Sequence, residues 1–381
     1  MALPQPQVPA DTPEARQYNR IHRWLSVADV ALGAAFLALL LALHWTNHLR
    51  DWSFNLSGQR YALGLLFYVA MLTLISQLIG LPLDYYSFRL EHRYQLSNQK
   101  LGSWAWDQVK EWLVGLVLGT LLLELIYLII RQAPEWWWLI AWAVVMVLFV
   151  VFAQLAPILL LPLFYKFIPL EDEALKQRLV QLSERAGTRV RGVYEWKLSE
   201  KSKKANAALT GLGRTRRIIL ADTLLSSYTG DEIEAVLAHE LGHHVHKHIF
   251  KSILVQAGIT LVGFWAANEV LRYVIVEREW FGLQSMGDFA GIPLLLLVSS
   301  VLSLLLLPLL NAYSRFNERQ ADRYCWANIP AIAPFVSAMN KLAGQNLSER
   351  NPSRVVEVLF HSHPPVSKRI SAAESWAAKR A

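Results

Sequence analysis

Two histidines and a glutamate lie close together in the segment His239–Glu240–Leu241–Gly242–His243. In a helix, residues i and i+4 project from one face, so both imidazoles can reach a single Zn²⁺ at about 2.0–2.1 Å. Glu240 is turned about 100° from His239 around the helix axis. Its carboxylate can therefore act as a general base toward a zinc-bound water. The spacing predicts one catalytic zinc ion per chain.

A catalytic zinc ion takes three protein ligands and keeps one position open. The polar stretch 314–322, directly after the last apolar run, supplies Glu318 as the candidate third ligand. Asp322 lies one turn further along the same helix face, where it can hold a ligating histidine by its other ring nitrogen. We therefore predict His239, His243 and Glu318 as metal ligands and Asp322 as their support.

The local sequence indicates that the two histidines lie within a helix. Thr229 and Glu232 have the spacing of a capping box, which marks a helix N-terminus. Apolar residues then recur at helical spacing up to Leu241. Before this helix, the runs 190–197, 205–210 and 216–221 are typical of short strands, so a small sheet is predicted beside the zinc helix.

The composition is that of a membrane protein rather than a soluble enzyme. Hydrophobic residues make up 54% of the 381 positions and charged residues 18%, against about 25% charged in soluble domains. A helix needs roughly 20 apolar residues to cross a bilayer. Six stretches approach or exceed this length: 25–45, 62–83, 112–130, 136–160, 250–271 and 292–312. The chain is therefore predicted to contact membrane lipid through six helices.

Basic residues in the loops predict the orientation of these spans. Arg16, Arg20 and Arg23 precede the first span, and the segments 84–110 and 166–248 are also rich in Lys and Arg. Cytoplasmic loops carry such an excess, so both termini and the active site are predicted to be cytoplasmic. The same distribution accounts for the net charge of +7. No nucleic-acid partner is expected, because the sequence has no RNA-binding signature and no zinc-finger spacing.

The apolar runs divide the chain into five predicted parts. They are a mobile cytoplasmic N-terminal tail (1–24), four transmembrane helices (25–165), a water-facing protease segment with the small sheet and the zinc helix (166–248), two transmembrane helices (249–313) and a C-terminal helical part that completes the zinc site (314–381).

Several motifs together resemble the type 1 CaaX prenyl proteases, which are integral-membrane zinc endopeptidases, with HtpX-like bacterial proteases as wider relatives. The resemblance rests on the segments 239–243, 318–322, 206–225 and 363–369. It implies His239, His243 and Glu318 as zinc ligands and Glu240 as the catalytic base. The implied fold is mainly α and polytopic: about six to seven transmembrane helices form a ring around a chamber, with a small cytoplasmic α+β metalloprotease domain.

The resemblance also implies roles for residues that the spacing alone leaves open. Asn206 and Ala207 match a cleft-lining segment, where a substrate would add as an extended strand; taken alone, this is equally an ordinary exposed strand edge. His363 matches a histidine that faces the scissile carbonyl and could stabilise the oxyanion. Without the resemblance, it lies in a turn before a C-terminal helix. Arg369 is expected to brace the site.

The predicted function is peptide-bond hydrolysis by a membrane-embedded, CaaX-prenyl-protease-like zinc metalloendopeptidase. Its substrate would be a prenylated or membrane-bound peptide or protein, in the bacterial inner membrane or the endoplasmic reticulum. One alternative is an HtpX-like quality-control protease for misfolded membrane proteins. Another is a metal-ion transporter, because Asp29, Glu124 and Glu269 lie within predicted spans. Their lack of paired spacing disfavours transport.

Overall fold

The computed structural model describes residues 11–211 and 216–380 and is mostly helical. Six helical segments in this part of the chain are long and apolar enough to cross a membrane, which confirms the predicted count. They are α1 (Pro13–Ala42), α3 (Tyr61–Arg93), α4 (Leu101–Gln132), α5 (Trp137–Leu159) with α6 (Leu161–Phe164), α10 (His248–Leu271) with the π-helical η3 (Arg272–Glu277), and α11 (Ile292–Asn328).

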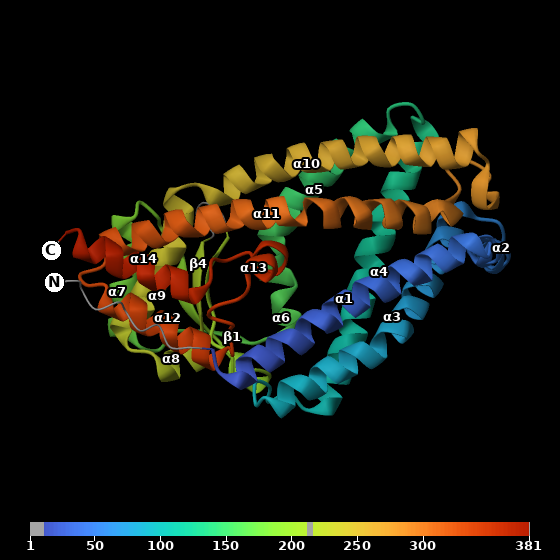
Figure 1. Cartoon of the computed structure of the whole chain (residues 1–381). Helices are drawn as coiled ribbons and strands as arrows, with labels where there is room; N and C mark the ends of the chain where they lie inside the picture. Colours follow the sequence, from blue (N-terminus) through green and yellow to red (C-terminus); the bar gives the residue numbers. More distant parts are fainter. Residues whose placement is uncertain (1–10, 212–215, 381) are drawn as a thin grey trace.

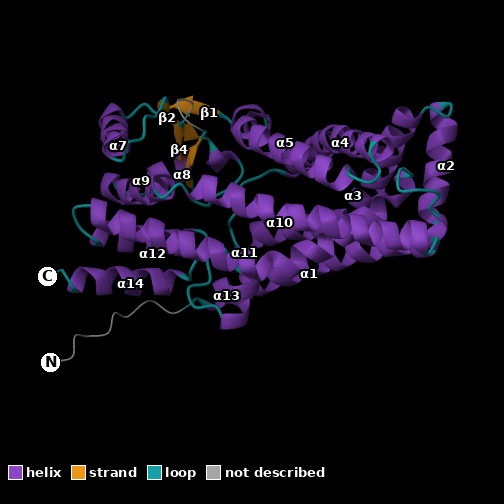
Figure 2. Ribbon diagram, turned by 90° about the horizontal axis from the view of Figure 1, so that it is seen from above, coloured by secondary structure: helices purple, strands orange, loops and turns teal. Residues whose placement is uncertain are grey.

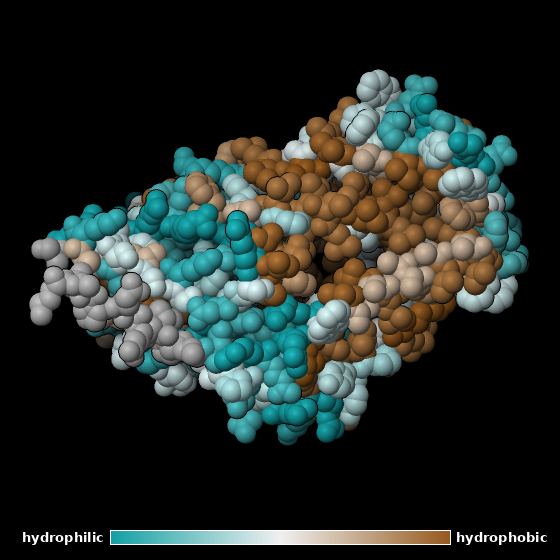
Figure 3. Space-filling model, in the orientation of Figure 1, coloured by the Kyte–Doolittle hydropathy of each residue, from teal (hydrophilic) through white to brown (hydrophobic). Residues whose placement is uncertain are grey.

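These helices make up the apolar half of the molecule. In Figure 1, α10 and α11 run along one side and α1 and α3 along the other, and the two pairs meet near the short helix α2 (Trp45–Ser57). The surface over these helices is strongly apolar, and Figure 3 shows an opening in it. At the α2 end, a buried ion pair between Arg50 on α2 and Asp288 stabilises the turn before α11. The apolar surface suits contact with lipid.

Residues 13–24, which the sequence assigned to a mobile tail, form the first turns of α1; residues 1–10 lie outside the described part. Thr12 caps this helix by accepting a hydrogen bond from the backbone N–H of Ala15. Two longer-range contacts, between Arg23 and Glu349 and between Tyr18 and Glu91, tie the helix to distant segments. The cap and these contacts hold in place a stretch that was predicted to be part of a mobile tail.

A four-stranded sheet lies at the other end of the molecule, with strand order β1-β2-β4-β3. The strands are β1 (Phe167–Pro169), β2 (Gly192–Trp196), β3 (Ala207–Thr210) and β4 (Arg217–Ala221). β2 and β4 are parallel, whereas β1–β2 and β3–β4 are antiparallel. The last three strands were expected from the sequence; β1 was not. β3 is an edge strand, so its outer side has no strand partner among the described residues.

Helices α7 (Glu173–Arg185), α8 (Asp222–Ser227) and α9 (Gly230–Val245) pack against the sheet, and the described part of the chain also begins and ends near this end (Figure 2). α9 begins at the predicted capping box of Thr229 and Glu232. Leu237 and Leu241 on α9 are buried together with Phe335, so α9 is held firmly by its apolar residues. The remaining helices are α12 (Ala333–Gln345), α13 (Arg354–Phe360) and α14 (Val366–Ala378).

Candidate active site

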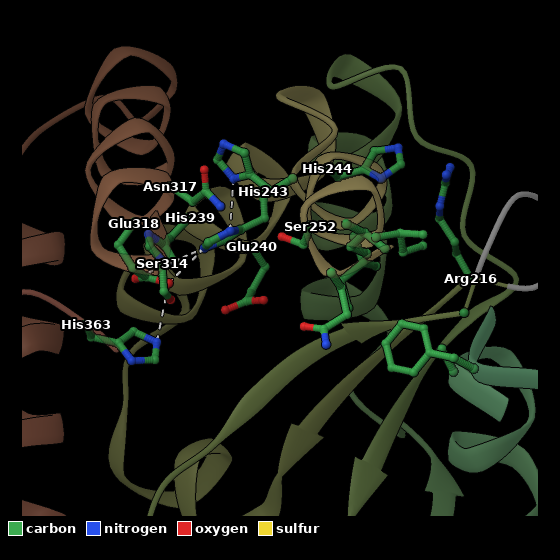
Figure 4. A pocket seen from close by; sticks show the side chains of 18 residues that line it. Arg216, His239, Glu240, His243, His244, Ser252, Ser314, Asn317, Glu318 and His363 are labelled. Carbon is green, nitrogen blue, oxygen red and sulfur yellow. Dashed lines mark hydrogen bonds and ion pairs between the residues drawn. The ribbon is translucent and has the colours of Figure 1, made fainter. Parts of the chain in front are cut away.

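α9 and α11 bring together three side chains that could hold a metal ion, as Figure 4 shows. His239 and His243 project from one face of α9, and their Nε2 atoms lie 3.2 Å apart. Glu318 on α11 places Oε2 3.3 Å from Nε2 of His239 and Oε1 3.2 Å from Nε2 of His243. The donor atoms of all three residues lie within 4.8 Å of one another. The structure therefore brings the three predicted ligands to one small volume.

The separations between these donor atoms fit a metal ion with tetrahedral coordination. Ligands about 2.0–2.1 Å from zinc lie about 3.3 Å from one another at tetrahedral angles. Oε2 of Glu318 is buried and accepts no hydrogen bond in the described structure, which is costly for a carboxylate unless a cation satisfies it. Burial alone lowers the pKa of His239, but the neighbouring carboxylates of Asp322 and Glu318 raise it to about 9. The carboxylates around His239 thus favour a positive charge at the place where the three candidate ligands meet.

Asp322 holds His239 from behind. Its Oδ1 atom lies 2.9 Å from Nδ1 of His239, so Nδ1–H donates and the lone pair of Nε2 faces the ligand cluster. Arg369 on α14 donates from Nε to Oδ2 of Asp322 at 2.9 Å and from Nη2 to Oδ1 at 2.6 Å. This two-point contact fixes the plane of the carboxylate. Asp322 and Arg369 therefore occupy supporting positions.

Glu240 lies beside the ligands without joining them. Its half-buried carboxylate points into the space between α9 and the sheet (Figure 4). Burial raises the pKa of Glu240 above its ordinary value, which suits a group that must accept and then release a proton near neutral pH.

His363 reaches the cluster from the loop before α14. Its Nε2 atom lies 3.3 Å from Oε1 of Glu318, and its side chain is 62% exposed. Ser362 contacts the other ring nitrogen of His363. The imidazole thus projects into the cleft beside the three candidate ligands.

Two cavities meet at His239, Glu240 and His363. A cavity of about 530 Å³, here called the α5–α10 cavity, extends between those two helices and is lined by Phe149, Ala153, Leu209, Ile249 and Ile253 with several polar groups. A cavity of about 800 Å³, here called the α1 cavity, is lined by Tyr18, His22, Asn206, Ala207 and Arg369, among others. The edge strand β3 therefore runs from one cavity to the other past Glu240.

The site contains a histidine that sequence reasoning left out of it. His248, which was not among the predicted site residues, is buried and places Nδ1 3.1 Å from Nδ1 of His243. The helical spacing could not reveal this, because α9 ends at Val245 and the left-handed φ of 55° at Lys247 separates it from α10. His246 lies next to it, and its ring stacks on the ring of His248.

Comparison with known proteins identifies two matching family models. "Peptidase family M48" matches residues 169–377, more than half of the chain. "CAAX prenyl protease N-terminal, five membrane helices" matches residues 7–166. The structure describes four candidate spans in this second region; α2 is a further helix there, but it is short and rich in polar residues.

Similar proteins come from bacteria and eukaryotes. An "uncharacterized metalloprotease YhfN" of Bacillus subtilis is 33% identical over 96% of this chain and 86% of its own length. "CAAX prenyl protease 1" of Saccharomyces cerevisiae is 29% identical over 82% of this chain and 72% of its own. The crystal structure of S. mikatae Ste24p superposes with a TM-score of 0.84 at 26% identity, covering 95% of this chain and 88% of that one. The chain therefore belongs to peptidase family M48 and is a membrane-embedded metallopeptidase.

Proposed function

We propose that this metallopeptidase is a zinc endopeptidase with His239, His243 and Glu318 as ligands and Glu240 as the general base. One observation carries the proposal: the three donor groups converge at 3.2–3.3 Å while the Glu240 carboxylate stands free beside them in the cleft. Two nitrogens and a carboxylate are a typical donor set of catalytic zinc.

Zinc in this site would polarise the scissile carbonyl and lower the pKa of water. Glu240 takes the proton of the attacking water and then gives it to the leaving amine. His363, exposed in the cleft, donates a hydrogen bond to the carbonyl oxygen as negative charge develops there. Asp322 keeps the Nδ1 proton of His239 in place, and Arg369 keeps Asp322 in place.

The substrate binds as an extended strand along the free edge of β3. Asn206 and Ala207 lie at the α1 cavity end of this strand and Leu209 at the α5–α10 cavity end. Backbone groups of an edge strand can pair with any extended peptide, so side-chain pockets must supply the specificity. The chain thus acts on unfolded or terminal peptide segments.

The α5–α10 cavity favours a substrate with a long apolar group beside the scissile bond. Phe149 and Ala153 belong to α5, and Ile249 and Ile253 belong to α10, both of which are candidate spans. A prenyl chain could enter from the membrane between them. The relatives named CAAX prenyl protease support this substrate class. The cleavage site lies on the cytoplasmic side, as the basic loops indicate.

The test uses purified protein with a farnesylated CaaX peptide and with an unprenylated membrane protein as substrates. Wild-type protein should cut the farnesylated peptide, and Glu240→Gln should retain bound zinc while its rate falls about 10²- to 10⁴-fold. Cleavage of only the unprenylated protein would favour the quality-control alternative. Zinc flux in liposomes without peptide cleavage would favour transport, and a fully active Glu240→Gln variant would refute the mechanism.

A further inference from the structure

The second ring nitrogen of His243 points away from the metal-binding atoms and toward another histidine. His243 Nε2 faces Glu318, whereas its Nδ1 lies 3.1 Å from Nδ1 of His248. His248 in turn places Nε2 2.9 Å from Oε1 of Gln320. Three side chains from α9, α10 and α11 thus form a continuous hydrogen-bonded row that ends at a predicted ligand.

The direction of the hydrogen bonds in this row follows from the amide oxygen at its outer end. Oε1 of Gln320 can only accept, so Nε2 of His248 carries the proton and donates it. A neutral His248 then has a lone pair on Nδ1, which accepts from Nδ1–H of His243. The remaining nitrogen of His243, Nε2, is left unprotonated. That nitrogen is the one aimed at the metal-binding volume.

The opposite arrangement would disable the ligand. If the amide of Gln320 were turned to present its NH₂ group, Nε2 of His248 would accept and its Nδ1 would carry the proton. Nδ1 of His243 would then accept, and the proton of His243 would lie on Nε2, where it blocks coordination. Only one orientation of Gln320 is therefore compatible with metal binding through His243.

The row is built into the protein interior. His248 is 3% exposed and is the first residue of α10. The preceding Lys247 has a left-handed φ of 55°, a conformation that costs free energy for a residue with a side chain. This turn brings His248 back against α9, and Gln320 lies on α11 between Glu318 and Asp322.

We propose that His248 and Gln320 are positioning residues that fix the metal-binding tautomer of His243. His248 and Gln320 orient His243 in the same way that Asp322 and Arg369 orient His239. Each of the two predicted histidine ligands is therefore held by two further residues. Unlike the carboxylate behind His239, the support behind His243 is uncharged at its outer end. The proposal deepens the proposed function, because it rests on His243 being a metal ligand.

Leucine and asparagine at position 248 form a matched pair for testing the proposal. Both side chains branch at Cγ and have similar shapes. Only asparagine has an oxygen at the place where Nδ1 of His248 accepts the hydrogen bond from His243. We expect His248→Leu to weaken zinc binding about 10- to 100-fold and His248→Asn to recover most of that loss. Gln320→Met, which removes the acceptor at the outer end, should weaken binding in the same direction.

Zinc affinity is measured on the full-length protein in detergent by competition with a chelator, independently of peptide cleavage. The visible spectrum of the Co²⁺-substituted protein reports whether the ligand geometry is retained. Gln77→Met on α3, whose amide contacts Gln108, is the control and should bind zinc like wild type. We call the hydrogen-bonded row from Gln320 through His248 to His243 the relay. Equal zinc affinity for His248→Leu and His248→Asn, whether normal or reduced, would overturn the proposed role of this relay.

Failure of the relay and failure of the proposed function give different results. If wild-type protein binds no zinc, or if His243→Ala binds it as tightly, His243 is not a ligand and the proposed function fails with the relay. If binding depends on His243 but not on the acceptor at position 248, only the relay fails. Should His248→Leu not fold, unchanged zinc affinity in Gln320→Met is the result that refutes the relay.

Discussion

At the scale of single residues, Asp322 carries the most demanding hydrogen-bond arrangement of the site. Its carboxylate is 2% exposed and contacts both His239 and Arg369. We predict that Asp322→Asn weakens zinc binding about 10- to 100-fold. The amide keeps the shape, but its NH₂ group opposes either the N–H of His239 or the guanidinium of Arg369. Chelator competition measures the loss.

The same substitution at Asp222 is the control for this prediction. Asp222 accepts hydrogen bonds from Ser199 in the turn before β3 and lines neither cavity at the site. Asp222→Asn should leave zinc affinity unchanged. Wild-type affinity in Asp322→Asn would mean that His239 keeps its orientation without the carboxylate, and the supporting role would be abandoned.

The sequence predicts those residues of the candidate site that follow helical spacing. His239 and His243 are one turn apart on one helix, as are Glu318 and Asp322, so i to i+4 reasoning placed each pair correctly on its helix. His248 depends on a left-handed turn at Lys247, a residue type that does not signal such a turn. Contacts of this kind require the tertiary structure.

At the scale of elements, the site depends on how closely α9 approaches α11. Gly242 lies between the two predicted histidine ligands and faces Ala321, which lies between Glu318 and Asp322. A Cβ atom added at Gly242 would lie 2.8 Å from Cα and 2.9 Å from the carbonyl oxygen of Ala321. Both are backbone atoms, so the helices would have to separate.

We predict that Gly242→Ala weakens zinc binding and destabilises the fold by about 1–3 kcal/mol. Separating α9 from α11 moves the two histidines away from Glu318, so the ligand set no longer closes on one ion. Thermal unfolding and zinc competition measure the two effects. Gly258→Ala on α10 is the control, because nothing lies within 4 Å of its added Cβ. Normal zinc affinity in Gly242→Ala would show that the contact does not set the ligand spacing.

The sequence predicted the number of membrane-spanning helices correctly but not where each helix begins and ends. Apolar runs revealed all six candidate spans because each is long enough to cross a bilayer. They underestimated α11, which continues as one helix from Ile292 to Asn328 through the polar segment that bears Glu318. A fall in hydropathy indicates where a segment leaves the lipid, but the helix itself can continue beyond that residue. β1 was missed because its three residues have no strand-like pattern apart from their pairing with β2.

At the scale of the whole molecule, six spans place both ends of the chain on one side of the membrane. Figure 1 shows the start of α1 and the end of α14 at the same end of the molecule as the sheet, with α2 at the opposite end. The predicted site lies at the sheet end, since α9 packs against β3 there. Because cytoplasmic loops are rich in Lys and Arg, the sheet end should face the cytoplasm and α2 the other side.

Cysteine labelling in intact bacterial cells that express the protein tests this orientation. Asn55 on α2 and Ser375 on α14 are both exposed, and the sole native cysteine, Cys325, is buried and should stay unlabelled. We predict that a membrane-impermeant maleimide labels Asn55→Cys in intact cells but labels Ser375→Cys only after the membrane is opened. The reverse pattern would place the zinc site outside the cytoplasm, where a cytoplasmic prenylated peptide could not reach it. Labelling of both positions in intact cells would instead show that the two ends of the molecule are not separated by the bilayer, contrary to six spans.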